Sequence, residues 1–498
     1  TPLLGQEPRL GTIVFPTSGA PAAQPAFIRG VLYLHSFEYA HAATAFREAE
    51  RLDPGFAMAY WGEAMTYTHP VWDQQNLDSG RMALAKLAPT AVGRIARAPT
   101  PRERGYLDAV ETLYGEGSKE RRDTLYSRAM VKLMEDFPDD AEARSFAALS
   151  ILGLNQGVRD VGAYMRAAAM VAPVFAANPD HPGAAHYLIH AFDDPLHAPL
   201  GLSAARAYIR IAPDAAHAQH MTTHIFLALG MWDETIAQNV IATNQTAYVP
   251  GHYTEWLGYG YLQAGRFADS RALLARVRGQ MSGAARQHAE LALMRAQHVV
   301  NAEEWTSDLW AWPLDASATP LLAAVDRFAR GFAAVRRGDT LAARAALAEL
   351  AAWSSRPGAP RDSIGASKVM VMAKELDGLL RLAAGDGPAA LATMRAAGEV
   401  ADALPVDFGP PDIVKPVHEL TGEMLLQLGR PAEAKVEFTK ALALAPGRAR
   451  SLIGLVRAAS AAGDRALAGE AYRILVTNWH AADADQGVLT ALRAMAGR

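Results

Sequence analysis

Apolar residues recur at helical spacing along nearly the whole chain from about residue 24 onwards. Short turns interrupt this periodicity again and again, so the pattern reads as helix, turn, helix throughout. Residues 1–23 are rich in proline, glycine and alanine and lack the periodicity. The sequence therefore predicts an all-α chain that follows an extended N-terminal arm.

Small and aromatic residues recur at matching positions in distant helix pairs. One set is Gly30, Ala42, Phe46, Ala49 and Pro54. A second set with the same internal spacing is Gly422, Ala434, Phe438, Ala441 and Pro446. These residues resemble the tetratricopeptide-repeat (TPR) family, whose repeat of about 34 residues is a helix pair. The resemblance implies a right-handed superhelical solenoid of roughly ten to thirteen TPR-like helix pairs.

The resemblance is specific near residues 24–68, 179–281 and 413–476 and weaker between them. Glycines in Leu229–Asp233 and Ala264–Ala268 indicate turns between paired helices. We divide the chain into the arm 1–23, a central array 24–305 with most of the histidines, an interrupted helical array 306–412, and C-terminal repeats 413–498.

Composition narrows the function only partly. The 498 residues are 50% hydrophobic, with a formal net charge of -4 and interspersed signs, which disfavours nucleic acid as a partner. No apolar run is long enough to predict a membrane span. Cysteine is absent, which excludes disulfides and thiolate ligands. Because the sequence begins with Thr1, we expect a removed signal peptide and a periplasmic or secreted protein, although a cytoplasmic location stays open.

Two histidine pairs occupy the same register of adjacent repeats. His186 and His190 form one H-x-x-x-H pair, and His220 and His224 form the second, 34 residues later. On a helix, residues four apart lie one turn apart on the same face. Equivalent helices of neighbouring repeats stack side by side, so the four imidazoles should converge in the concave groove. Such a cluster is typical of a transition-metal site.

The following repeat adds candidates to the cluster. Aligning Gly230 with Gly265 places His252 and Glu255 in the register of the histidines. The predicted metal ligands are therefore His186, His190, His220, His224 and His252. Glu255 is the predicted catalytic residue, as a general base, although a ligand or hydrogen-bonding role is also open. The participation of His69, His197, His217 and His418 stays open, and His181, His35, His41, His288, His298 and His480 are interpreted as ordinary histidines.

Imidazole ligation favours copper or zinc, with iron or nickel as further options. The leading hypothesis is a metalloprotein that acts on a small-molecule or peptide ligand in the groove, as an oxidoreductase or a hydrolase. The alternatives are a protein- or peptide-binding scaffold, which the TPR resemblance implies by default, and a non-catalytic metal carrier. In the metal-free alternative the histidines hydrogen-bond one another in a polar groove. The oligomeric state is not indicated.

Overall fold

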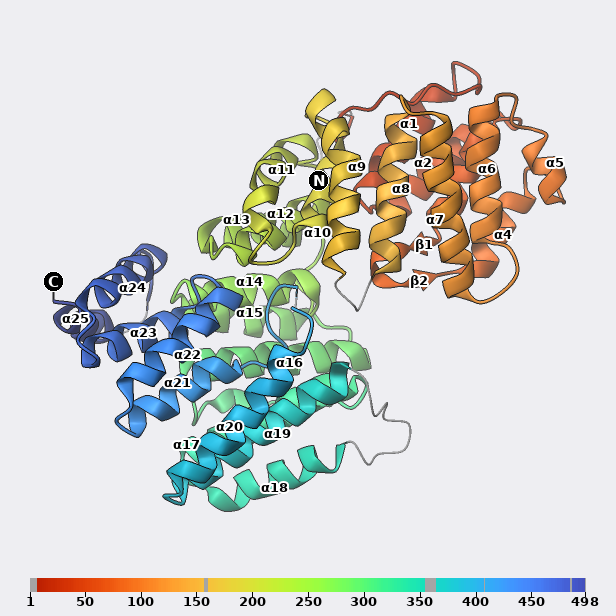
Figure 1. The fold of residues 1–498 in the computed structure, drawn as a ribbon. Coiled ribbons are helices and arrows are strands. Elements are labelled where there is room, and N and C mark those ends of the chain that lie inside the picture. Colours follow the sequence, from red (N-terminus) through yellow and green to blue (C-terminus); the bar gives the residue numbers. More distant parts are fainter. Residues whose placement is uncertain (1–6, 156–159, 354–363, 407, 484–485, 498) are drawn as a thin grey trace. The chain divides into compact units, whose positions relative to one another are not determined.

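The computed structural model describes residues 7–155, 160–353, 364–406, 408–483 and 486–497. Their regular structure is helical, apart from one pair of two-residue strands and two 3-10 turns, so the all-α prediction is confirmed (Figure 1). The chain divides into two compact units, residues 1–225 and 226–498. Among the described residues, no helix is both long and apolar enough to cross a membrane.

The first unit stacks consecutive helices as antiparallel neighbours. Its elements are α1 (Gln24–His35), α2 (Tyr39–Leu52), α3 (Ala57–Met65), β1 (Thr68–His69), η1 (Pro70–Trp72), β2 (Gln74–Gln75), α4 (Leu77–Ala85), α5 (Ala91–Ile95), α6 (Pro101–Leu113), α7 (Lys119–Asp136), α8 (Ala141–Leu154), α9 (Val161–Ala177), α10 (Pro182–Ala191), α11 (Ala198–Ile211) and α12 (Ala216–Ala228), the last of which runs across the boundary. β1 and β2 pair antiparallel, with Thr68 opposite Gln75, in a hairpin that the helical periodicity did not predict.

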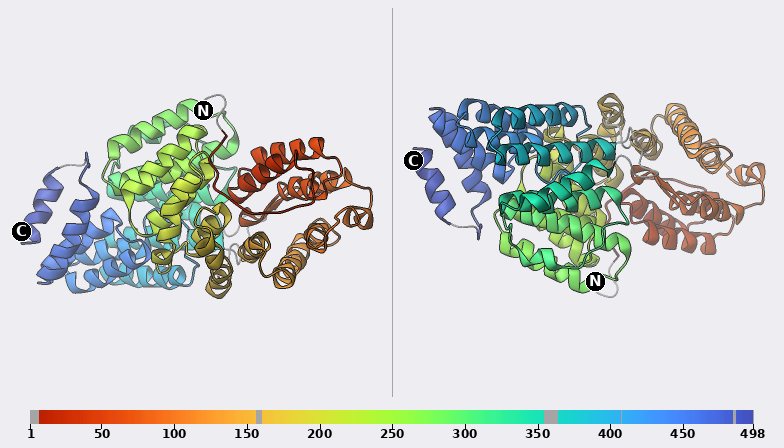
Figure 2. Two further views of the ribbon diagram at one scale, coloured as in Figure 1. Left: turned by 90° about the horizontal axis from the view of Figure 1, so that it is seen from above. Right: turned by 90° about the horizontal axis from the view of Figure 1, so that it is seen from below.

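The second unit continues the same architecture, and α17 to α20 lie side by side when seen from below (Figure 2). Its elements are α13 (Trp232–Gln245), α14 (His252–Gln263), α15 (Phe267–Gln280), α16 (Ala285–Ala302), η2 (Asp308–Ala311), α17 (Pro320–Arg336), α18 (Thr340–Ala351), α19 (Ile364–Ala383), α20 (Gly387–Asp402), α21 (Val417–Gln427), α22 (Pro431–Leu444), α23 (Ala449–Ala461), α24 (Arg465–Asn478) and α25 (Gln486–Met495).

The glycine and phenylalanine positions explain the tight packing within both units. A Cβ atom on Gly30 or Gly62 would come within 2.6 Å of the Phe46 ring. In the second unit, Gly422 and Gly454 approach the buried Phe438 in the same way. The absence of a side chain lets a ring from the second helix of a pair enter between the first helices of two successive pairs. The helix-pair architecture predicted from these residues is confirmed.

The N-terminal arm is held against the first unit over its described part. Thr12 donates its backbone N–H to the Asp180 carbonyl at 3.0 Å. Arg9 pairs with Asp214 through its backbone and its guanidinium. Phe15 is buried against Phe27, Trp61 and Tyr106. The arm therefore adds Phe15 to the core beside α1, α3 and α6, and hydrogen-bonds the residues that precede α10 and α12.

Candidate metal centre

Helix α10 begins at Pro182 and is capped by a histidine. His181 is the N-cap, and its Nδ1 accepts the Ala184 N–H at 3.1 Å. Pro182 takes the first helical position, where its missing N–H costs nothing. Asp180 lies outside the helix: its side chain is exposed, and its carbonyl accepts from Thr12 of the arm.

His186 and His190 lie one turn apart on α10 and face each other. Their Nε2 atoms are 3.1 Å apart, and His186 is fully buried. The Nδ1 atom of His186 donates to the backbone carbonyl of His35 at 2.7 Å. This hydrogen bond fixes the tautomer of His186 and directs its Nε2 lone pair towards His190, as second-sphere acceptors do for metal-binding histidines.

His217, at the start of α12, joins this pair. The facing ligand atoms of His186, His190 and His217 all lie within 4.8 Å of one another. The imidazole of His217 packs on the Phe37 and Trp72 rings, with centroids 5.4 Å away in both cases. The sequence left the role of His217 open, and the structure places it in the same buried group as the α10 pair.

The second predicted pair repeats the geometry of the first on α12. The Nε2 atoms of His220 and His224 are 3.2 Å apart, and both side chains are buried. His224 Nδ1 donates to the Asp193 carboxylate at 2.5 Å, an arrangement that orients an imidazole for metal binding. The ring centroids of His190 and His224 are 6.1 Å apart, so the two pairs are neighbours.

The electrostatics keep at least one of these imidazoles neutral. Burial is the main cause that lowers the pKa of His186 to about 3. The His35 carbonyl contact opposes this shift, and the proximity of His224 and His35 adds to it. A neutral imidazole is the form that binds a metal. Two Nε2 atoms separated by 3.1 Å would subtend an angle of roughly 100° at an ion about 2.05 Å from each. The His186–His190 pair is therefore suited to tetrahedral or square-planar ligation.

The remaining predicted residues lie in the second unit. His252 is the first residue of α14, and its contribution to the cluster stays a prediction. Glu255, in the first turn of the same helix, accepts from the Gln297 side-chain amide at 2.9 Å. Burial raises the pKa of Glu255 to about 8, so its carboxyl group carries a proton at neutral pH.

Three other histidines have different partners. His197 Nδ1 contacts the Asp194 carboxylate at 2.7 Å. His69 stacks on Tyr39 with ring centroids 3.9 Å apart, and its Nε2 contacts the Thr66 carbonyl. In the second unit, His418 lies between Glu437 and Asp402, whose carboxylates raise its pKa.

A buried triad beside the cluster was not predicted. The Glu142 carboxylate contacts His35 Nε2 at 2.6 Å and His181 Nε2 at 3.1 Å. Burial would raise the pKa of Glu142, but both histidines lower it overall to well below its usual range. His181 Nδ1 caps α10 and His35 Nδ1 contacts the Tyr187 hydroxyl at 2.9 Å, so both ring nitrogens of each histidine have a partner within the protein. We interpret it as a structural support that holds the His35 carbonyl against His186.

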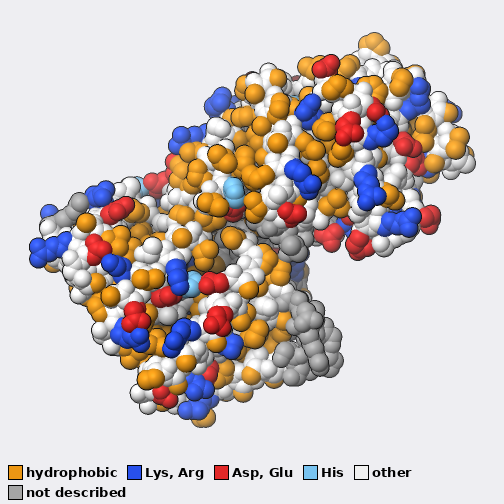
Figure 3. All heavy atoms as spheres, viewed as in Figure 1, with side chains coloured by type: hydrophobic (Ala, Val, Ile, Leu, Met, Phe, Trp, Pro, Cys, Tyr) orange, Lys and Arg blue, Asp and Glu red, His pale blue; other side chains and the backbone are white. Residues whose placement is uncertain are grey.

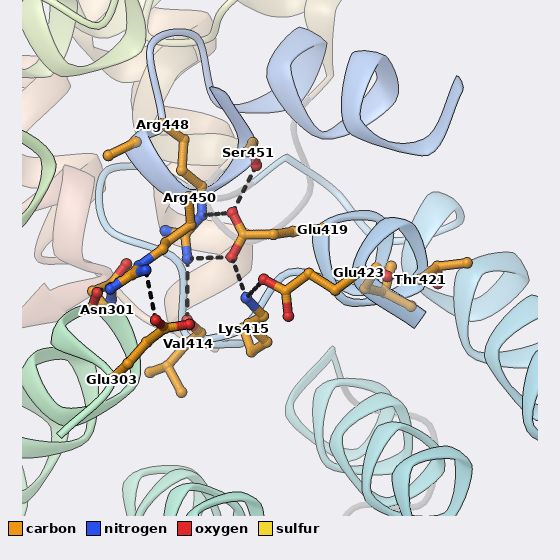
Figure 4. Close-up of polar contacts among 12 residues, drawn as sticks. Asn301, Glu303, Val414, Lys415, Glu419, Thr421, Glu423, Arg448, Arg450 and Ser451 are labelled. Atoms are coloured by element: carbon orange, nitrogen blue, oxygen red, sulfur yellow. Dashed lines mark hydrogen bonds and ion pairs between the residues drawn. The ribbon is translucent and has the colours of Figure 1, made fainter. Parts of the chain in front are cut away.

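The second unit contains a buried cluster of a different kind, centred on Glu419 (Figure 4). Its carboxylate accepts from Arg448 Nε at 2.7 Å and from the Ser451 hydroxyl at 2.6 Å. Lys415 Nζ lies 2.9 Å from the same carboxylate and also pairs with Glu423. Burial would raise the pKa of Glu419, but Arg448 and Lys415 lower it overall. This network consists of opposite charges that neutralise one another.

Comparisons with known proteins assign no role to these residues. No family model matches the chain, and no curated protein matches it. Among solved structures, the chain is similar to a human IFIT1 dimer with PPP-AAAA, at 14% identity over 92% of this chain and 91% of that one, with a TM-score of 0.38. It is also similar to the APC/C hetero-tetramer Cut9–Hcn1, at 11% identity over 96% and 97% of the two chains, with a TM-score of 0.32.

Proposed function

We propose that the first unit binds one or more transition-metal ions through buried histidines and that the bound metal acts on a small molecule. The observation that supports this most strongly is the repeated pair geometry on α10 and α12. In each pair the Nε2 atoms face each other at 3.1–3.2 Å. In each pair, too, one Nδ1 is fixed by an oxygen acceptor, the His35 carbonyl or the Asp193 carboxylate.

His186, His190, His217, His220 and His224 are the proposed ligands from the first unit. His252 remains a proposed ligand on the strength of its register in the sequence. Copper and zinc fit an imidazole set best, with iron or nickel as further options. A metal that leaves one coordination position open could polarise a substrate or water, or exchange electrons, which corresponds to hydrolase or oxidoreductase chemistry.

The scaffold alternative is favoured less, because the histidines on α10 and α12 are buried and face one another, so a partner at the surface would not reach them. On the face shown in Figure 3, lysine and arginine side chains are interspersed with aspartate and glutamate. This face therefore offers no concentrated charge of one sign for a charged partner.

Elemental analysis tests the proposal on protein purified without a metal-affinity tag and dialysed against a mild chelator. We expect about one equivalent or more of copper or zinc, either retained or regained on titration of the metal-free protein. Less than a tenth of an equivalent, with none regained, would leave the histidines as a metal-free hydrogen-bonded network. Exposed His41 supplies the control variant His41→Ala, which should bind as wild type does.

Glu255 is tested separately. Glu255→Gln removes the titratable carboxyl proton and keeps the shape. Retained metal with lost turnover would support general acid–base chemistry, whereas weaker metal binding would support a ligand or hydrogen-bonding role. If neither changes, Glu255 does not belong to the site.

A further inference from the structure

The proposed ligands of the first unit gather in two sets, which belong to two successive repeats. In the α10 set, the ring centroid of His186 lies 4.8 Å from that of His190 and 5.2 Å from that of His217. In the α12 set, the ring centroids of His220 and His224 lie 5.0 Å apart. Between the sets, the centroids of His190 and His224 lie 6.1 Å apart, and those of His217 and His220 lie 6.2 Å apart. The imidazoles are therefore closer within each set than between the sets.

Within each set, the nitrogens that can bind a metal are directed at one another. The Nε2 atoms of His186 and His190 are 3.1 Å apart, and those of His220 and His224 are 3.2 Å apart. A ligand nitrogen lies about 2.0–2.1 Å from its ion, so an ion beside the line that joins two such atoms can reach both. The lone pairs of each helix thus converge on a point of their own.

Each set also has its own hydrogen-bond acceptor, supplied by a different segment of the first unit. The carbonyl of His35, the last residue of α1, accepts from His186 Nδ1 at 2.7 Å. The carboxylate of Asp193, just after α10, accepts from His224 Nδ1 at 2.5 Å. Such an acceptor orients an imidazole for metal binding, so each set is oriented independently of the other. The two acceptors differ in charge, because the carbonyl is neutral and the carboxylate is negative.

The sequence extends the same construction into the following repeat. His217, in the first turn of α12, completes the α10 set, because its ligand atom lies within 4.8 Å of those of the α10 pair. Aligning Gly230 with Gly265 gives His252 the register of His217. On the strength of this register alone, His252 is the proposed third ligand of the α12 set.

We propose that the first unit holds two metal ions at once, one in each histidine set, and that the two sites are not equivalent. The inference rests on the proposed metal-binding function and deepens it. The Asp193 carboxylate offsets part of the charge of the α12 ion, whereas the α10 set has only a neutral acceptor. Two adjacent ions can bind two atoms of one molecule together. The substrate class is then a small molecule that offers one ligand atom to each ion.

Titration of the metal-free full-length protein with Cu(II) tests the number of ions. We expect about two equivalents in wild type and about one in His186→Ala and in His220→Ala, because each variant disables one set. The double variant should bind none. His190→Ala and His224→Ala repeat the test on the same two sets, in case the fully buried positions do not tolerate alanine. His41→Ala, at an exposed position, is the control and should bind two equivalents.

Electron paramagnetic resonance tests whether the two ions are neighbours. Adjacent Cu(II) ions couple, so the signal of fully loaded wild type should be broadened and weakened, whereas each single variant should give the spectrum of an isolated ion. Asp193→Asn should alter the spectrum in the His186→Ala background, where only the α12 ion remains. It should leave the spectrum unchanged in the His220→Ala background, where only the α10 ion remains.

The outcomes separate this inference from the proposed function. One equivalent in wild type that either single variant abolishes would mean that both sets share one ion, and would overturn the inference while leaving a metal site. Two equivalents with an uncoupled spectrum in wild type would also overturn it, because the ions would not be neighbours. No bound metal in wild type would overturn the metal site itself and the inference with it.

Discussion

The histidine cluster of the first unit and the Glu419 network of the second unit are both buried polar groups between stacked helices, but their chemistry differs. Around Glu419, a carboxylate is surrounded by an arginine, a lysine and a serine hydroxyl, and the charges compensate one another. In the cluster, imidazole nitrogens face imidazole nitrogens. A network of complementary charges needs no further partner, whereas a group of like lone-pair donors suits an added cation. The comparison teaches that the nature of the facing atoms, more than burial, separates a structural network from a candidate binding site.

Arg448→Met should produce the largest effect on stability. It leaves the Glu419 carboxylate buried beside Lys415 without its arginine, and loss of one partner of a buried pair costs about 3–5 kcal/mol. Chemical unfolding of the second unit measures this loss, and metal binding should be unchanged. Arg430→Met, which breaks an exposed pair with Glu433, should cost under about 1 kcal/mol. Equal losses for the two variants would contradict a structural role for the network.

His186→Ala and His220→Ala should have the opposite profile. We expect metal affinity to fall by more than the roughly 100-fold that loss of an orienting partner can cause. Helical content should stay near wild type, because the stability of a helical-repeat array is spread over many interfaces. Metal titration and circular dichroism measure the two effects. Normal metal binding by both variants would remove these residues from the site, and global unfolding would place them with the structural network.

Asp193→Asn should have a smaller effect on the same property. The variant keeps the size of the side chain but weakens the hydrogen bond that orients His224. Such partners are typically worth about 10–100-fold in metal affinity. Asp180→Asn, at an exposed position of the same unit, is the matched control. If the two variants bind metal alike, Asp193 does not orient a ligand.

Glu255→Gln should have the smallest effect, and it should depend on pH. Because burial raises the folded-state pKa of Glu255 from 4.5 to about 8, its contribution to stability is present below pH 4.5 and is lost as the pH rises through about 8. The variant should therefore match wild type at low pH and be more stable at pH 8, by of order 1–2 kcal/mol after solvent screening. Denaturation at both pH values measures this. A difference that does not change with pH would mean that the folded carboxyl is already ionised.

Local patterns predicted much of the fold and part of the site. The glycine-to-phenylalanine spacing anticipated the close approach at Phe46 and Phe438, and four-residue spacing placed both histidine pairs correctly on one face of their helices. Contacts between residues distant in sequence were not predicted. His35 lies 107 residues from Glu142 and supports His186 through its backbone, which no periodicity reveals. The backbone of Phe37, whose φ is +56°, also has no signature in the sequence, because glycine or asparagine is expected in this left-handed region.

X-ray absorption spectroscopy of the copper- or zinc-loaded protein tests the central claim most directly. The account predicts a first coordination shell of nitrogen at about 2.0–2.1 Å, with the outer-shell scattering of at least three imidazole rings, reduced in His186→Ala. A first shell without imidazole scattering, or a spectrum that His186→Ala leaves unchanged, would contradict it.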